Sequence, residues 1–208
     1  MISLQQYLRD PCGTASIPYW KEKQIVVPEN MRIIHERDYR SEEYCDYSDE
    51  PYFRLYHDLV TVDPLTTSEL EIVSGASDLD EFVSLINSCY YDLSVTKEQL
   101  EGYQKTPVYR SELWVILKEK SSGIVVAGGI ADYDREIGEL ILEWIQVLPS
   151  WRGRGYGQII VNCLLTRMLG IAKFATVSGK VNNPTNPQSL YRRCGFTGKD
   201  IWHILTKK

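Results

Sequence analysis

The sequence has few cysteines and histidines, and neither residue type is clustered. Five cysteines are widely spaced along 208 residues, no Cys-x-x-Cys pair occurs, and the three histidines are scattered. A disulfide framework usually has an even number of cysteines, and a structural zinc site needs closely spaced ligands. The sequence therefore predicts neither kind of site. A reducing compartment, the cytoplasm, is the simplest setting for such a chain.

Long apolar runs and an excess of positive charge are also absent. The longest apolar run, 124–131, is far too short to span a bilayer, and no basic region followed by an apolar run opens the chain. The net charge of −5 argues against general nucleic-acid binding. Apolar residues make up 43% and charged residues 25%, so the composition predicts an ordinary globular protein without nucleic-acid or membrane partners.

One glycine-rich segment carries the most information, Arg152-Gly153-Arg154-Gly155-Tyr156-Gly157. An alternating, strand-like stretch precedes it at 139–149, and an apolar, helix-like stretch follows at 158–170. A glycine-rich turn that opens a helix collects unpaired backbone N–H groups at the positive end of the helix dipole. Alternate glycines keep Cβ atoms away, so an anion such as a pyrophosphate can approach the backbone.

The spacing of the glycines excludes two common phosphate-binding loops. A dinucleotide-binding Gly-x-Gly-x-x-Gly would need a third glycine where Gln158 or Ile160 stands. A Walker A loop would end in Gly-Lys-Ser/Thr, which the segment lacks. The pattern that fits is Arg/Gln-x-x-Gly-x-Gly/Ala, with Arg152, Gly155 and Gly157 at its fixed positions.

This pattern resembles motif A of the GNAT superfamily of N-acetyltransferases, which binds the pyrophosphate of acetyl-CoA. A second stretch, 182–196, resembles motif B of the same family. Its Tyr-x-x-x-Gly-Phe ending matches at Tyr191, Gly195 and Phe196. Because the two motifs occur in the family's order, the resemblance is assigned to residues 68–208.

The predicted elements of this region follow the order β-α-α-β-β-β-α-β-α-β. The resemblance implies the GNAT acyl-CoA N-acyltransferase fold, an α/β (α+β) fold with a mixed central sheet flanked by helices. Residues 1–67, with a candidate strand at 52–59, are expected to form an N-terminal extension of unknown function packed on this core. The core strands are expected at 69–73, 113–119, 123–133, 139–147, 174–180 and 201–206, and helices near Asp78, Thr96, Gln158 (ending at Gly170) and Pro187.

The resemblance implies an acetyl-CoA site around the glycine-rich segment. Val147 would offer its backbone N–H to the thioester carbonyl, with Leu148 beside it. Arg152 and Arg154 would supplement the loop amides, which hold the pyrophosphate. The two motif B asparagines are expected either to hydrogen-bond the pantetheine or to cap the helix that follows. The predicted cofactor-binding residues are Val147, Leu148, Arg152, Gly153, Arg154, Gly155, Tyr156, Gly157, Gln158, Asn183 and Asn186.

Acetyl transfer to an amine needs a base for the amine and an acid for the departing thiolate. Tyr191 matches the family tyrosine that donates this proton. Regular alternation along the strand places Glu139, Glu143 and Val147 on one face, which makes Glu143 the first candidate base and Glu139 the reserve. The family's best-known glutamate position holds Ile141. A water-mediated base, or a role for Glu143 in binding a substrate ammonium, therefore stays open.

The acceptor site is the least defined part of the prediction. In the family it is lined by the loop after the first helix, where Tyr91 and Asp92 stand, and Glu139 is a third candidate contact. Cys194 is expected to be a small buried residue and not a nucleophile, because the family transfers the acetyl group directly.

The sequence thus predicts an acetyl-CoA-dependent N-acetyltransferase, an acyltransferase that acts by direct transfer in a ternary complex. The acceptor would be a primary amine of a small molecule or a peptide. The alternative is a non-catalytic acyl-CoA-binding sensor or interaction module of the same fold. No metal is implied, and the oligomeric state stays open, with a homodimer as one option.

Overall fold

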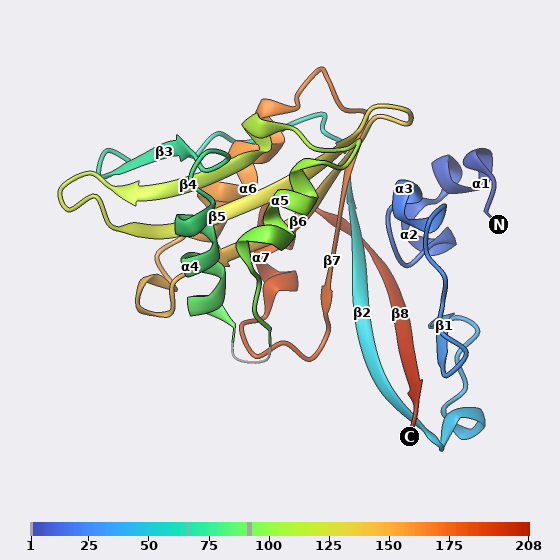
Figure 1. Cartoon of the computed structure of the whole chain (residues 1–208). Helices are drawn as coiled ribbons and strands as arrows, with labels where there is room; N and C mark the ends of the chain where they lie inside the picture. The colour runs from blue at the N-terminus through green and yellow to red at the C-terminus, as the bar shows by residue number, and fades with distance from the viewer. Residues whose placement is uncertain (1, 66, 91–92) are drawn as a thin grey trace. The chain divides into compact units, whose positions relative to one another are not determined.

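The computed structural model describes residues 2–65, 67–90 and 93–208 (Figure 1). The chain divides into two compact units, which are described separately. Unit 1 comprises Met1–His57 and Thr176–Lys208, and unit 2 comprises Asp58–Ala175. Helices and strands are interleaved along the chain, and the predicted α/β class is confirmed. The predicted division into an extension, 1–67, and a GNAT domain, 68–208, stays a prediction.

Unit 2 contains an antiparallel sheet whose strands follow the order β6-β5-β4-β3. Each strand lies within a few residues of its predicted position, because each is an apolar run bounded by turn residues. β5 is buried along nearly its whole length, which requires cover on both faces. The strands are β3 (Leu70–Ser74), β4 (Trp114–Glu119), β5 (Val125–Asp134) and β6 (Glu139–Val147).

Helices provide this cover. A Cβ atom added to Gly128 of β5 would meet Leu85 of α4, whereas one added to Gly129 would meet Ile160 of α6. Because successive side chains of a strand point to opposite faces, α4 and α6 lie on opposite faces of the sheet. The helical segments of unit 2 are α4 (Leu79–Cys89), α5 (Lys97–Gln104), η2 (Ser111–Leu113), η3 (Pro149–Trp151) and α6 (Tyr156–Arg167).

Side-chain caps start α4 and α5 where the sequence predicts. Asp78 Oδ1 accepts a hydrogen bond from the Glu81 amide over 3.0 Å. Thr96 and Gln99 form a reciprocal capping box at the start of α5. Each cap satisfies backbone N–H groups that have no partner inside the helix.

The ends of α6 differ from the prediction. The helix begins at Tyr156 rather than Gln158, because the left-handed Gly155 already serves as its N-cap. It ends at Arg167 rather than at the expected Gly170. The Met168 amide donates to the Leu165 carbonyl over 3.0 Å, and this tighter bond closes the last turn early.

A β-bulge interrupts the pairing of β6 with β5. Ile130 pairs with Trp144, but the next residue, Ala131, pairs with Leu142. Glu143 is therefore the extra residue of the bulge, which the pairing register skips. Such a bulge breaks the regular alternation of side chains along a strand.

The bulge overturns one premise of the sequence-based argument. Val147 pairs with Ala127 and Glu139 pairs with Asp134. Ala127 and Asp134 are an odd number of residues apart on β5, so they point to opposite faces. The prediction that Glu139, Glu143 and Val147 share one face is therefore wrong, because it assumed an unbroken strand.

Unit 1 has the strand order β1-β8-β2-β7, in which β2 pairs antiparallel with β8. The predicted strand at 52–59 is part of a longer β2, and the closing strand starts before residue 201. The elements are α1 (Leu4–Arg9), α2 (Pro11–Thr14), α3 (Tyr19–Glu22), β1 (Met31–His35), η1 (Ser41–Tyr44), β2 (Tyr47–His57), β7 (Phe174–Lys180), α7 (Pro187–Arg193) and β8 (Thr197–Lys207), with β7 entering from unit 2.

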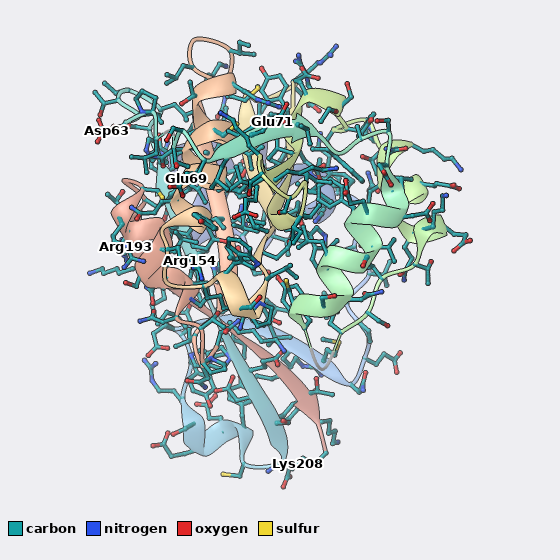
Figure 2. All side chains as sticks on the ribbon, turned by 90° about the vertical axis from the view of Figure 1, so that its left-hand side faces the viewer. Asp63, Glu69, Glu71, Arg154, Arg193 and Lys208 are labelled. Atoms are coloured by element: carbon teal, nitrogen blue, oxygen red, sulfur yellow. The ribbon has the colours of Figure 1, made fainter. Side chains whose placement is uncertain are left out.

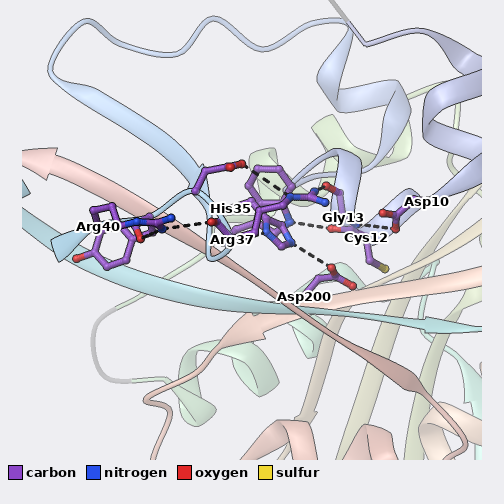
Figure 3. A network of polar contacts seen from close by, with 10 residues as sticks. Asp10, Cys12, Gly13, His35, Arg37, Arg40 and Asp200 are labelled. Carbon is purple, nitrogen blue, oxygen red and sulfur yellow. Dashed lines mark hydrogen bonds and ion pairs between the residues drawn. The ribbon is translucent and has the colours of Figure 1, made fainter. Parts of the chain in front are cut away.

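Polar contacts join the first helices to β1 and β8 within unit 1 (Figure 3). Asp200 on β8 lies 3.1 Å from His35 Nε2 on β1. The Arg37 guanidinium donates to the carbonyl of Gly13. Trp202 Nε1 donates to the Cys12 carbonyl over 2.8 Å. The beginning and the end of the chain therefore belong to one packed unit.

Candidate functional site

The loop between β6 and α6 presents a row of unpaired backbone N–H groups. Within the part of the chain that the structure describes, no group accepts a hydrogen bond from the amides of residues 153–157. The next amide, that of Gln158, already bonds to the Gly155 carbonyl over 3.0 Å. α6 is 12 residues long, so its dipole adds partial positive charge at these amides. The arrangement suits an anion such as a pyrophosphate.

Two glycines give this loop its shape. Gly153 and Gly155 have φ angles of +79° and +83°, which residues with a Cβ atom rarely adopt. A Cβ atom added at either position would meet nothing within 4 Å. The backbone conformation therefore requires glycine, while the space beside it is open to a ligand.

Arg152 supports the loop from within unit 2. Its Nε donates to the Val147 carbonyl over 3.1 Å, and its Nη2 donates to the Cys89 carbonyl at the end of α4 over 3.2 Å. These bonds hold the ends of β6 and α4 together and satisfy a helix carbonyl that has no partner inside the helix. The sequence did not predict this role, because it depends on a carbonyl far away along the chain.

Arg154 is an exposed arginine of the loop between β6 and α6 (Figure 2). Its guanidinium carbon lies 4.7 Å from the centre of the Trp151 ring, a cation–π contact that orients the side chain. Both arginines are predicted to supplement the loop amides. Unlike Arg152, Arg154 donates no hydrogen bond to a backbone carbonyl of the described residues.

The end of β6 has the orientation that the predicted thioester contact needs. The Leu148 amide donates to the Val126 carbonyl of β5 over 3.0 Å. Successive N–H groups of a strand point to opposite sides, so the Val147 N–H points away from β5. Both Val147 and Leu148 are half-buried.

The two candidate bases differ in exposure. Glu143, the bulged residue, is half-buried. Glu139 has no exposed surface and stands directly opposite Asp134. Glu143 is therefore the more accessible carboxylate of the two.

Tyr191, Asn183 and Asn186 belong to unit 1. The Tyr191 ring is buried on α7, 6.2 Å from the ring centre of Phe53 and 5.7 Å from that of Phe196. These aromatic contacts fix the direction of the phenol.

The motif B asparagines hydrogen-bond within their own turns. Asn186, with φ +47°, is the N-cap of α7, and its side chain accepts from the Ser189 amide over 3.3 Å. Asn183 Oδ1 accepts from the Thr185 amide over 2.9 Å. The structure thus contains the capping contact that was one of the two expectations for Asn186. Contact with pantetheine stays a prediction.

The sequence was compared with known families and structures. Residues 109–198 match the family model described as acetyltransferase (GNAT) domain. The match covers fewer than half of the 208 residues and identifies this part of the chain as similar to a GNAT acetyltransferase domain. The matched range runs from before β4 to the start of β8, so the glycine loop and Tyr191 both lie within it.

Solved structures confirm the GNAT fold. A GCN5-related N-acetyltransferase from Sphaerobacter thermophilus is 17% identical with a TM-score of 0.66, covering 89% of this chain and 62% of that one. A GNAT-family acetyltransferase from Colwellia psychrerythraea is 15% identical with a TM-score of 0.61, covering 90% and 69%. This chain thus spans less than two thirds of the length of the Sphaerobacter protein. A comparison with curated proteins found no match.

The remaining predicted residues of the GNAT domain can be placed briefly. Cys194 is buried, and burial raises the pKa of its thiol to about 12, so it is protonated at neutral pH. Tyr91 and Asp92 lie outside the described residues. None of the helices in the described ranges is long and apolar enough to cross a membrane.

Proposed function

We propose that this chain is an N-acetyltransferase that moves an acetyl group from acetyl-CoA to a primary amine by direct transfer in a ternary complex. The observation that carries the proposal is the run of unpaired amides at 153–157, at the start of a long helix inside a GNAT domain. An acetyl-CoA pyrophosphate fits such a run, because it supplies the negative charge and acceptor oxygens that these amides lack.

Several groups of unit 2 would hold acetyl-CoA. The loop amides and Arg154 would bind its phosphates, with Gln158 at the edge of the loop. The Val147 N–H would polarise the thioester carbonyl, with Leu148 beside it. Bound acetyl-CoA would supply an acetyl group activated as a thioester.

The proton transfers are assigned to two side chains. Glu143, directly or through water, would take a proton from the acceptor amine, and Tyr191 would donate one to the departing thiolate. Direct transfer is supported by Cys194, whose raised pKa makes an acyl-cysteine intermediate unfavourable. Glu139, Tyr91 and Asp92 stay proposed acceptor contacts. The acceptor is a small molecule or peptide, and the proposed compartment is the cytoplasm.

The acetyl-CoA assignment is tested by a matched pair of glycine substitutions. Gly155→Val forces a branched side chain onto a left-handed residue in the loop. Gly123→Val does the same on the β4–β5 hairpin, where φ is +70° and an added Cβ would also meet nothing within 4 Å. Both variants should lose stability by about 1–3 kcal/mol through backbone strain. Only Gly155→Val should lose acetyl-CoA binding in calorimetry.

Turnover with a panel of primary amines separates the enzyme from the alternative sensor. The wild type should release CoA in an amine-dependent manner, and acetylated amine should appear in equal amount. Binding of acetyl-CoA without any amine-dependent release would favour the sensor. Equal acetyl-CoA affinity in both glycine variants would refute the loop assignment.

A further inference from the structure

Gln146 is a buried polar residue whose side chain has no hydrogen-bond partner in the part of the chain that the structure describes. Its exposed fraction is 4%. Neither Oε1 nor Nε2 finds a partner among the described residues. Buried polar groups are almost always paired in native proteins, so an unpaired carboxamide demands an explanation. An apolar side chain of similar size would occupy the same place without this cost.

The register shows which face of the sheet Gln146 occupies. It pairs with Gly128 on β5, and paired residues of neighbouring strands point to the same face. A Cβ atom added to Gly128 would lie 2.6 Å from Leu85 Cδ2 and 3.2 Å from Phe82 Cε1, both on α4. The carboxamide therefore lies on the α4 face, beside apolar side chains that offer no hydrogen bond.

Other contacts bring the end of α4 to this part of β6. The Tyr90 ring, just after α4, lies 5.8 Å from the Trp144 ring, edge to face. Trp144 precedes Gln146 by two positions, so the two side chains share a face. Arg152 reaches the last carbonyl of α4, that of Cys89. The carboxamide thus stands on the face where α4 ends, one residue before Val147.

We propose that Gln146 is an acceptor-binding residue that favours amines carrying a neighbouring amide or hydroxyl group. This inference rests on the proposed function. A carboxamide has an acceptor in Oε1 and a donor in Nε2, so it matches a group that both donates and accepts. A peptide amide or a hydroxyl has both capacities, whereas a plain alkylamine leaves the buried carboxamide unpaired. Sites of this kind discriminate strongly against the analogue that lacks the polar group.

Acceptor selectivity provides the test. Glycinamide, ethanolamine and propylamine are compared by kcat/KM in the wild type and in Gln146→Met, which keeps the bulk and removes the carboxamide. The preference for glycinamide and ethanolamine over propylamine should fall about 10- to 100-fold in this variant, the loss expected for one or two hydrogen bonds. The KM for acetyl-CoA should not change, and the unfolding midpoint should stay equal or rise.

A matched control makes the same substitution elsewhere in unit 2. Gln104 on α5 donates to the Ala76 carbonyl over 2.7 Å, so Gln104→Met removes a carboxamide with an internal partner. It should lower stability and leave acceptor selectivity unchanged. If Gln146→Met also leaves selectivity unchanged, Gln146 only fills space and the inference is overturned.

A second measurement does not depend on turnover. The side-chain NH₂ signal of Gln146 is assigned in ¹⁵N-labelled protein by its absence from Gln146→Met. Glycinamide should shift this signal in the presence of CoA, and propylamine should not. A protein that turns over no amine would refute the proposed function. If glycinamide does not change the chemical shift of the Gln146 NH₂ signal, the role of Gln146 in acceptor binding is overturned.

Discussion

At the scale of single residues, the proposed chemistry depends on how each polar side chain is held. Burial and two aromatic neighbours hold the Tyr191 ring in place. Glu143 owes its position to the β-bulge at which the register between β6 and β5 shifts. Removing either functional group should therefore change the chemistry more than the fold.

The acid and the base are tested together by pH profiles of kcat/KM. Tyr191→Phe should lower kcat by about 10²-fold, since a positioned acid contributes at least this much, with unchanged acetyl-CoA affinity.

Glu143→Gln should flatten the rise of kcat/KM with pH, because that rise reports loss of the proton from the base. Unfolding midpoints close to the wild type are the control. A wild-type profile in Glu143→Gln would assign the base to water or Glu139.

At the scale of elements, the glycine-rich segment and the motif B residue Asn186 each lie at the start of a helix. α6 begins at a left-handed glycine and leaves its first amides unpaired for a ligand. α7 begins at a left-handed asparagine whose side chain pairs an amide of its own first turn. The first helix start is proposed to bind a ligand, and the second is capped by its own side chain.

Substitutions of Asn186 separate its two expected roles. Asn186→Gly keeps the left-handed conformation at no steric cost, and glycine is a tolerated cap, so stability should fall by only a few tenths of a kcal/mol. Asn186→Ala loses both features and should cost about 1–2 kcal/mol. Acetyl-CoA affinity equal to the wild type in both variants, measured by calorimetry, would leave capping as the role of the side chain. An equal loss of acetyl-CoA affinity in the two variants would instead assign the side chain to pantetheine.

At the scale of the whole molecule, the N-terminal segment supplies two strands, β1 and β2, to unit 1, which also contains residues 176–208. In unit 1, β2 lies between β8 and β7, and β1 pairs with the other edge of β8. The buried Tyr7, Phe53 and Leu55 add apolar packing to the same unit. The first 57 residues are therefore expected to be indispensable for folding of unit 1.

Removal of Met1–His57 tests this expectation. Without β1 and β2, both paired edges of β8 would present unpaired backbone groups and apolar side chains. The truncated chain should be aggregated or lack a cooperative unfolding transition by circular dichroism. A separate peptide of residues 1–57, added during refolding, should restore the transition. A truncated chain that folds and binds acetyl-CoA by itself would show that the N-terminal strands are dispensable.

Much of the fold could be predicted because its signals are local. The caps at Asp78 and Thr96, the apolar strands of unit 2 and the spacing of Arg152, Gly155 and Gly157 each act within a few residues of chain. Apolar periodicity and turn chemistry are properties of short segments, so a single sequence is enough to read them.

The sequence by itself thus determined the glycine loop, the motif B helix and the order of helices and strands in residues 68–208. Only the tertiary structure decided that β2 pairs with β8, that Glu143 bulges from β6 and that Arg152 binds the end of α4. It also decided that Gln146 is buried with no hydrogen-bond partner among the described residues. Each of these facts joins segments far apart in the chain. Their energies depend on register and packing between strands and helices, which no local pattern of residues specifies.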